Sequence, residues 1–327
     1  MPLVSVVIVN WNGRGVVEPC LRRVLQLDWP RLEVLVVDNA SSDGSPAAIR
    51  EEFGGRVRLM GRSENSVTAA RNEGFRAAAG EYIVSLDNDI LLPDSLLVRR
   101  AVALFEARPE VSALAFKIGS VEQPHCPLRA HWWHPVPLRR GGGRFFYTCY
   151  FGEGGVAFRR TALAATGGYD EMFHQGHEGP ELALRMLAAG GEILYCPNLV
   201  CAEQRVPDAL PGARRRIKAR SLRNKLWMAW KSYPLSRAVP YAAGRLAVAG
   251  VRAARYGWLN LWWQSAREGV LAPAEIRRQR RPLPPALWNR LHRIRQGDFP
   301  ALTMAGGTGP GTPQQPFLQE YESYDLP

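Results

Sequence analysis

The chain has 327 residues, 46% of them hydrophobic, and a formal net charge of +12. This length and composition suit one large globular domain or two smaller ones, and they exclude a chain that is disordered throughout. The first residues lack a basic leader and a small-residue cleavage site, and the five cysteines include no Cys-x-x-Cys pair and suggest no disulfide framework. We therefore expect a cytoplasmic protein.

The first part of the chain alternates strand and helix patterns. The apolar run Val4–Val9 predicts a buried strand, residues 16–27 have helical spacing, and Leu32–Val37 predicts a second strand. This order predicts a parallel pair of strands with a right-handed crossover. The same patterns continue with a helix at 47–53, a strand at 57–60, a helix in 65–74, a strand from 82, a helix at 96–107 and a strand at 112–118.

Polar residues follow three of the predicted strands. Asn10–Asn12 follows the first strand, Asp38 the second, and Asp87 and Asp89 the strand that begins at residue 82. Ligands of open parallel sheets bind outside the carboxyl ends of the strands, where these residues would all lie. Asp38 could accept hydrogen bonds from a nucleobase or a ribose. Asp43 fits better as the entry to the helix at 47–53.

The two carboxylates of Asp87 and Asp89 are separated by one residue. Hard cations such as Mg²⁺ or Mn²⁺ prefer oxygen ligands and commonly bind through one or two carboxylates together with substrate phosphates. The alternative is a simple turn, because Asp and Asn are common after strands. Asp-x-Asp alone is a weak signal for a metal.

The middle of the chain contains a Pro-rich stretch at 120–144 and a second set of polar motifs. The stretch holds His125, Cys126, His131 and His134, whose spacing matches no common zinc pattern, so stacking on a sugar or packing under the loop are alternatives. A helix at 161–166, a helix from 178 to 189 and a strand at 194–197 complete the predicted elements of this part.

Four motifs together resemble a known family. They occur in the order and spacing of the inverting, nucleotide-sugar-dependent glycosyltransferases of family 2, which have the GT-A fold, a mixed but mostly parallel α/β sheet flanked by helices. The motifs are Val-Ser-Val-Val-Ile-Val-Asn-Trp-Asn at 4–12, Val-Val-Asp-Asn-Ala-Ser-Ser-Asp-Gly-Ser at 36–45, Ala-Ala-Arg-Asn-Glu-Gly at 69–74 and Leu-Asp-Asn-Asp at 86–89.

The resemblance implies roles for individual residues. The nucleotide of a UDP-, dTDP- or GDP-sugar would be bound by residues after the first two strands, with an arginine on the same side. Asp87 would contact the ribose or the metal, and Asp89 would ligate a divalent cation, Mg²⁺ or Mn²⁺, on the diphosphate. The residues implied for the nucleotide are Asn10, Trp11, Asn12, Asp38, Arg71 and Asp87.

The acceptor side departs from the family pattern in two places. The family usually has Glu-Asp-x-Asp-Leu, whereas this chain has Glu178-Gly179-Pro180-Glu181-Leu182, so the commonest base position is Gly179. Glu178 or Glu181 could be the general base, and we prefer Glu178 because it precedes the helix. Where members often place a metal-binding His, this chain has Glu203, which could ligate a hard cation.

The positive charge lies in the last third of the chain. Residues 1–210 contain 22 Lys and Arg against 24 Asp and Glu, a net charge of −2, whereas residues 211–327 contain 20 against 6, a net charge of +14. Apolar and Trp-rich stretches interrupt this basic segment, which suits an anionic membrane surface better than a nucleic acid.

A long helical region is expected there, broken near Pro234 and Pro240 and resumed over 242–268. It lacks the ~20 uninterrupted apolar residues of a spanning helix. At ~100° per residue, one helical face would carry several arginines, and packing on the catalytic domain is the alternative to membrane binding. The arginines of that face are Arg245, Arg252, Arg255 and Arg267.

We therefore predict a GT-A domain at 1–210, a basic amphipathic helical region that associates with the membrane at 211–304, and a disordered tail at 305–327. Arg-Asn-Lys-Leu-Trp at 223–227 and the later basic cluster resemble bacterial rhamnosyltransferases, which act on lipid-linked saccharides. The implied protein transfers a hexose or deoxyhexose to a glycan hydroxyl at the inner face of the membrane and binds no nucleic acid. The alternative is a non-catalytic nucleotide-sugar-binding or membrane-scaffold protein of the same fold, motivated by Gly179 and Glu203.

Overall fold

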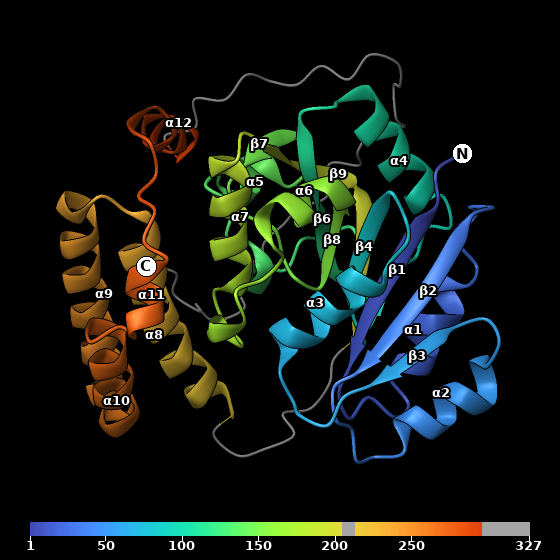
Figure 1. Cartoon of the computed structure of the whole chain (residues 1–327), viewed down its shortest axis with the longest axis horizontal. Coiled ribbons are helices and arrows are strands. Elements are labelled where there is room, and N and C mark those ends of the chain that lie inside the picture. The colour runs from blue at the N-terminus through green and yellow to red at the C-terminus, as the bar shows by residue number, and fades with distance from the viewer. Residues whose placement is uncertain (205–212, 296–327) are drawn as a thin grey trace.

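The computed structural model describes residues 1–204 and 213–295 (Figure 1). Its strands are β1 (Val4–Asn10), β2 (Leu32–Asp38), β3 (Arg58–Gly61), β4 (Tyr82–Asp87), β5 (Ile90–Leu91), β6 (Val111–Ser120), β7 (Phe146–Thr148), β8 (Gly155–Arg159) and β9 (Glu192–Glu203). They form one sheet in the order β3-β2-β1-β4-β8-β6-β9-β5, with β7 paired to β9. The expected mixed, mostly parallel α/β sheet is confirmed.

The carboxyl ends of the first strands meet at one edge of the sheet. β1 pairs in parallel with β2 and β4, which places Asn10 opposite Asp38, and Val9 opposite Asp87. β8 runs antiparallel to β4 and begins opposite the end of β4, with Gly155 facing Leu86. The loop that precedes β8 therefore reaches the same edge. The polar residues after β1, β2 and β4 therefore lie together, as predicted.

Helices cover both faces of the sheet. They are α1 (Val17–Val24), α2 (Ser45–Phe53), α3 (Val67–Ala77), α4 (Leu97–Ala107), α5 (Leu138–Gly141), α6 (Arg160–Thr166), α7 (Glu178–Ala188), α8 (Ala213–Ser232), α9 (Leu235–Tyr256), α10 (Leu259–Val270), α11 (Ala274–Arg278) and α12 (Pro285–Arg295). Side chains alternate along a strand. Thus Val6 and Ile8 pack in the core with α1, α2 and α4, whereas Val7 packs in a second core with α3, α6, α7 and α8.

Strand β9 is longer than the four residues predicted at 194–197. It pairs with β6 from Glu192 to Glu203, and its register slips where Phe116 faces Cys196 and Lys117 faces Val200. The slip leaves out Pro197, as expected for a proline that cannot donate to the ladder. The strand resumes after this irregularity and carries Glu203 to the edge of the sheet where β4 ends, opposite Ile90 of β5.

The C-terminal helices differ from the prediction. α9 runs through Pro240, which lies early in the helix, after the amides of Arg237 and Ala238 bond to the carbonyl of Pro234, each at 2.8 Å. The helix ends at Tyr256, and the next residue, Gly257, has a φ of +70°, a left-handed conformation that glycine adopts readily. The prediction of a single helix over 242–268 was therefore wrong.

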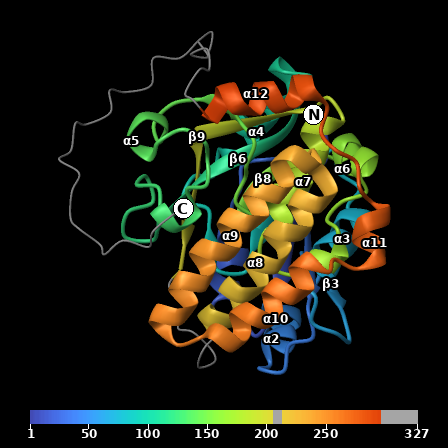
Figure 2. The same ribbon diagram turned by 90° about the vertical axis from the view of Figure 1, so that its left-hand side faces the viewer.

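This break also removes the predicted basic face. Arg245, Arg252 and Arg255 lie on α9, whereas Arg267 lies on α10, so the four arginines do not share one helix. Helices α8, α9 and α10 lie side by side over α7 and the sheet (Figure 2). No helix in the described ranges has both the length and the apolar content needed to cross a membrane. The predicted tail at 305–327 lies outside the described residues.

Candidate active site

Asn10, the last residue of β1, is fully buried and connects the loops that follow three strands. Its side-chain Nδ2 donates to Asp38 Oδ1 at 3.0 Å and to Ser45 Oγ at 2.8 Å, and its Oδ1 accepts from Asn88 Nδ2 at 3.0 Å. Each polar atom of the side chain thus has a partner within the protein. The contacts favour a positioning role for Asn10 over the predicted direct contact with a nucleotide.

Asp38 and the loop after β1 form one side of this edge. Asp38 is buried, and its Oδ2 accepts the amide of Ser41 at 3.1 Å. Trp11 is 43% exposed, and Asn12 accepts the amide of Ser42 at 2.8 Å. An exposed indole beside a buried carboxylate can stack on a flat ring and orient its polar groups. The predicted capping role of Asp43 agrees with its 3.0 Å bond from the amide of Ser45, the first residue of α2.

Arg71 lies on α3, which packs on the face of the sheet opposite to α1 and α2, and its side chain extends to the same sheet edge. Arg71 is 2% exposed, and its Nη2 forms an ion pair with Asp87 Oδ1. Its Nη1 donates to the carbonyl of Glu153 at 3.3 Å, and its carbon lies 5.7 Å from the centre of the Tyr169 ring. The structure thus places Arg71 at the predicted site, where it orients Asp87 and connects it to the loop before β8.

Asp89 lies in a cluster of carboxylates at the end of β4. Gln204 donates its amide to the carbonyl of Asp89 at 2.8 Å, next to Glu203 on β9. Burial, and then the negative charges of Asp87 and Glu203, raise the pKa of Asp89 to about 7. A cation would relieve this repulsion, because an opposite charge stabilises an ionised carboxylate.

The cluster is not a preformed metal cage. Across the described ranges, no three His, Cys, Asp or Glu side chains are arranged to hold a metal ion. Such an open arrangement fits a cation that takes part of its ligands from substrate phosphates. Asp87 and Glu203 both act on the pKa of Asp89, and the roles of these three residues as metal ligands stay predictions.

The histidines of the loop at 120–144 separate in the structure, so the zinc alternative is not supported. His131 lies 2.9 Å from Glu203, between its Nε2 and the carboxylate Oε2. Burial alone would lower the pKa of His131, but the hydrogen bond and charge of Glu203 raise it above its ordinary value. His134 instead contacts Thr148 at 2.8 Å and packs against Trp132.

Two glutamates, Glu153 and Glu178, lie close enough to Asp87 for its charge to act on their pKa values. Glu178, the first residue of α7, is 6% exposed, and its Oε2 has no hydrogen-bond partner. Burial and the charge of Glu153 raise the pKa of Glu178 to about 8. Glu153 accepts the amide of Gly179 at 2.7 Å through its Oε1. A carboxyl whose proton affinity is raised in this way is a candidate acid or base.

The raised pKa of Glu178 predicts a pH dependence of stability. Because the folded state holds the proton more tightly than the unfolded chain, with a pKa of about 8 against 4.5, stability should fall as the pH rises between these values. The neighbouring charges are Glu153, Arg71 and Asp87. Removing the charge with Glu178→Gln should therefore raise the free energy of unfolding at high pH by roughly 1–3 kcal/mol, the cost of a buried unpaired polar group.

Urea denaturation of the wild type and Glu178→Gln at about pH 5 and about pH 8.5 checks this expectation. The gain should appear at the higher pH and shrink at the lower. Glu51→Gln, at an exposed position of α2, is the matched control and should leave the free energy of unfolding unchanged at both pH values. An equal effect of Glu178→Gln at both pH values would contradict the buried, proton-holding carboxyl.

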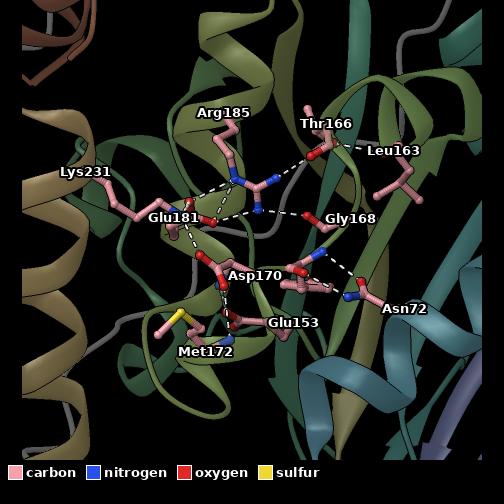
Figure 3. A network of polar contacts seen from close by, with 12 residues as sticks. Asn72, Glu153, Leu163, Thr166, Gly168, Asp170, Met172, Glu181, Arg185 and Lys231 are labelled. Atoms are coloured by element: carbon pink, nitrogen blue, oxygen red, sulfur yellow. Dashed lines mark hydrogen bonds and ion pairs between the residues drawn. The ribbon is translucent and has the colours of Figure 1, made fainter. Parts of the chain in front are cut away.

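Glu181 is occupied by structural contacts (Figure 3). Its carboxylate is fully buried and accepts from Arg185 Nη2 at 2.7 Å and pairs with Lys231 Nζ at 2.7 Å. Arg185 also donates to the carbonyls of Thr166 and Gly168 at 2.6 Å and 2.8 Å. A fully paired carboxylate cannot take a proton from an acceptor, so Glu178 is the better of the two predicted bases.

Two residues of this site were missed by the sequence analysis. Glu153 lies in a Gly-rich loop, and no role was predicted for it. Asn88, the middle residue of Asp-x-Asp, fixes Asn10, and a Cβ at Gly13 would lie 2.2 Å from its Nδ2. The only signal for Glu153 was indirect, because Gly179 left the family's base position without a side chain.

Comparison with known proteins identifies the class of fold. The sheet order and the flanking helices are those of GT-A glycosyltransferases. The Pyrobaculum calidifontis mannosyltransferase PcManGT in complex with GDP-Man and Mn²⁺ has a TM-score of 0.54 and 24% identity, covering 91% of this chain and 86% of that one. S. aureus TarS 1–349 in complex with UDP-GlcNAc has a TM-score of 0.60 and 15% identity, covering 90% and 88%.

The family follows from the sequence comparison. Residues 5–167 match the model described as Glycosyl transferase family 2, and the chain belongs to this family. Among curated relatives, the putative teichuronic acid biosynthesis glycosyltransferase TuaG of Bacillus subtilis is 35% identical over 91 residues, which are 27% of this chain and 36% of TuaG. The match thus spans about a third of that relative.

Proposed function

We propose that the chain is an inverting glycosyltransferase that moves a hexose or deoxyhexose from a nucleoside diphosphate sugar to a hydroxyl of a lipid-linked cell-surface glycan. The observation that carries the proposal is the arrangement of two pairs of acidic residues at one edge of the sheet. Asp87 and Asp89 form one group, Glu153 and Glu178 the other, and Arg71 contacts a member of each. The first group suits a cation on a diphosphate, and the second suits a general base.

Related proteins support the acceptor class. The name of TuaG refers to teichuronic acid biosynthesis, and a Rhizobium meliloti relative, 34% identical over 107 residues, is the succinoglycan biosynthesis protein ExoO. Both names describe polysaccharides. By this likeness we place the acceptor among growing cell-envelope glycans.

The donor side would bind a UDP-, dTDP- or GDP-sugar with Mg²⁺ or Mn²⁺. Asp89 would be the principal metal ligand, Asp87 would contribute its second oxygen while Arg71 holds the first, and Glu203 would complete the protein ligands. The bound cation would act as a Lewis acid that stabilises charge on the diphosphate. Trp11 and Asp38 would contact the nucleoside through stacking and hydrogen bonding.

The chain's own residues would perform the proton transfer. A carboxylate of the Glu153 and Glu178 pair takes the proton of the acceptor hydroxyl, and the acceptor oxygen forms the new bond to the anomeric carbon. The bond from that carbon to the diphosphate oxygen breaks, and its electron pair leaves with the nucleoside diphosphate. Attack opposite the leaving group inverts the configuration at this carbon.

A panel of UDP-, dTDP- and GDP-sugars tests the function. Release of one nucleoside diphosphate is expected in the presence of Mn²⁺, with a membrane lipid extract as the acceptor source. Chelation by EDTA should abolish the release, and added Mn²⁺ should restore it. Binding of a nucleotide sugar without any release would instead support the non-catalytic alternative.

The helices α9 and α10 support a peripheral membrane role at the cytoplasmic face. They lie at the outside of the molecule (Figure 2) and expose large apolar side chains. Val251 is 70% exposed and Trp263 66% exposed. Arg252 lies four residues after Val248 and Arg255 four residues after Val251 on α9, so basic and apolar groups adjoin on the helix surface. Such a combination suits an anionic lipid surface.

Replacing Val251 and Trp263 together by serine should weaken membrane binding of the full chain by tenfold or more. Each lost apolar side chain would remove about 1.5–3 kcal/mol of burial in the lipid boundary. Flotation with phosphatidylglycerol-containing vesicles measures the bound fraction, and Val121→Ser, at a 45% exposed position just after β6, is the control. Unchanged flotation of the double variant, or displacement of the wild type by DNA, would contradict membrane docking through these helices.

A further inference from the structure

Gly179 and Glu153 compete for the same space. A Cβ built on Gly179 would lie 2.1 Å from Glu153 Oε1, 2.6 Å from its carboxyl carbon and 3.2 Å from its Cγ. Two non-bonded atoms cannot approach so closely, so a side chain at position 179 and the present position of Glu153 exclude each other. The carboxylate of Glu153 therefore fills the place where a short side chain at the second position of α7 would begin.

Glu153 is held in this place from two directions. Its Oε1 accepts the amide of Gly179 at 2.7 Å, at the amino end of the 11-residue helix α7. Its backbone carbonyl accepts from Arg71 Nη1 at 3.3 Å, and the same guanidinium pairs with Asp87. The next residue also adjoins Asp87, since a Cβ on Gly154 would lie 3.4 Å from Asp87 Oδ2. Glu153 is thus fixed between the start of α7 and the diphosphate side of the site.

The neighbouring Glu178 differs from Glu153 in exposure and in hydrogen bonding. Glu178 is buried and has an oxygen without a partner, whereas Glu153 is half-buried and has a helix amide on its carboxylate. Burial raises the pKa of Glu153 above its ordinary value, although the Arg71 guanidinium and the amide of Gly179 act in the opposite direction. Burial beside Glu153 raises the pKa of Glu178 to about 8, so Glu178 keeps its proton at neutral pH. Glu153 is therefore the more accessible member of the pair and the one that a helix amide holds in place.

We propose that Glu153 is the catalytic base of this transferase and takes the place of the side chain that Gly179 lacks. The inference rests on the proposed function, glycosyl transfer to a hydroxyl. The carboxylate of Glu153 takes the proton of the acceptor hydroxyl. The oxygen's electron pair then forms the bond to the anomeric carbon, and the diphosphate leaves with the electrons of the broken bond.

The isosteric variant Glu153→Gln separates catalysis from binding. Its kcat for nucleoside diphosphate release should fall by about 10²–10⁴-fold, the usual contribution of a positioned general base. Binding of UDP, dTDP or GDP with Mn²⁺, measured by calorimetry, should stay within about twofold of the wild type, because the base contacts the acceptor and not the nucleotide. Glu51→Gln is the matched control on the exposed face of α2 and should keep full activity.

Moving the carboxylate from position 153 to position 179 tests directly whether the two side chains can occupy the same place. Glu153→Gly should lose activity as Glu153→Gln does, and Gly179→Asp alone should lower the melting temperature, because its Cβ meets Glu153. The double variant Glu153→Gly, Gly179→Asp should melt higher than Gly179→Asp alone and regain at least about tenfold in kcat over Glu153→Gly. A helix-borne carboxylate then fills the place that Glu153 has left.

Distinct results would overturn this inference and the proposed function. If the wild type releases nucleoside diphosphate and Glu153→Gln does so at a similar rate, Glu153 is not the base, although the transferase function stands. A double variant that folds and binds nucleotide but gains nothing over Glu153→Gly would show that the two positions are not equivalent. If the wild type releases nothing from any donor of the panel, the proposed function itself fails.

Discussion

Replacing Asp89 by alanine is expected to lower donor turnover by about a thousandfold or more. A metal that stabilises charge on a leaving diphosphate contributes several kcal/mol, and each 1.36 kcal/mol is a factor of ten in rate. Asp89 is the carboxylate whose pKa is raised by the charges of both Asp87 and Glu203, and Asp87 already uses one oxygen for Arg71. Loss of Asp89 should therefore leave too few ligands to hold the cation.

Stability separates this effect from misfolding. Burial and like charges raise the pKa of Asp89, so the folded protein gains nothing from its negative charge, and Asp89→Ala should melt at or above the temperature of the wild type. Asp28→Ala, which removes an exposed carboxylate that pairs with Arg99, is the control and should keep full turnover. Unchanged nucleoside diphosphate release by Asp89→Ala would contradict the metal site at the end of β4.

The donor side of the site could be predicted because local signals define it. Apolar runs fix the strands, and the polar residues after them meet because parallel strands end at one edge of the sheet. The common location of Asp38, Asp87 and Asp89 at this edge was predicted in this way. The partners of these residues were not, since the pairing of Arg71 with Asp87 depends on how α3 packs across the sheet.

The acceptor side depends on contacts that no local pattern records. Glu153 reaches the start of α7 across 26 residues of chain, and Glu203 reaches the edge of β4 because β9 resumes after an irregularity at Pro197. The end of α9 is different. Gly257 follows a helical pattern at the position where a left-handed glycine commonly terminates a helix, so this signal was available in the sequence.

The junction between the acceptor side and the C-terminal helices contains a buried network of charges (Figure 3). Lys231 of α8 is 5% exposed, and its Nζ lies 2.5 Å from Asp170 Oδ2 and 2.7 Å from Glu181 Oε1. Asp170 begins a turn whose preceding residue, Tyr169, donates its amide to Asn72 of α3 at 2.8 Å. One ammonium group thus connects α8 to α7 and to the turn that packs against α3.

Lys231→Met should lower the free energy of unfolding by about 3–5 kcal/mol, because removing one partner of a buried ion pair leaves the other charges uncompensated. Two carboxylates face Lys231, and only Glu181 has Arg185 as a second cation. Urea denaturation measures the loss.

The matched control is Arg99→Met, which breaks an exposed pair with Asp28 and should cost less than about 1 kcal/mol of unfolding free energy. A loss for Lys231→Met no larger than that of the control would mean that α8 is held by its apolar contacts alone. Restoration of stability by combining Lys231→Met with Asp170→Asn would instead confirm that the uncompensated carboxylate is the cause.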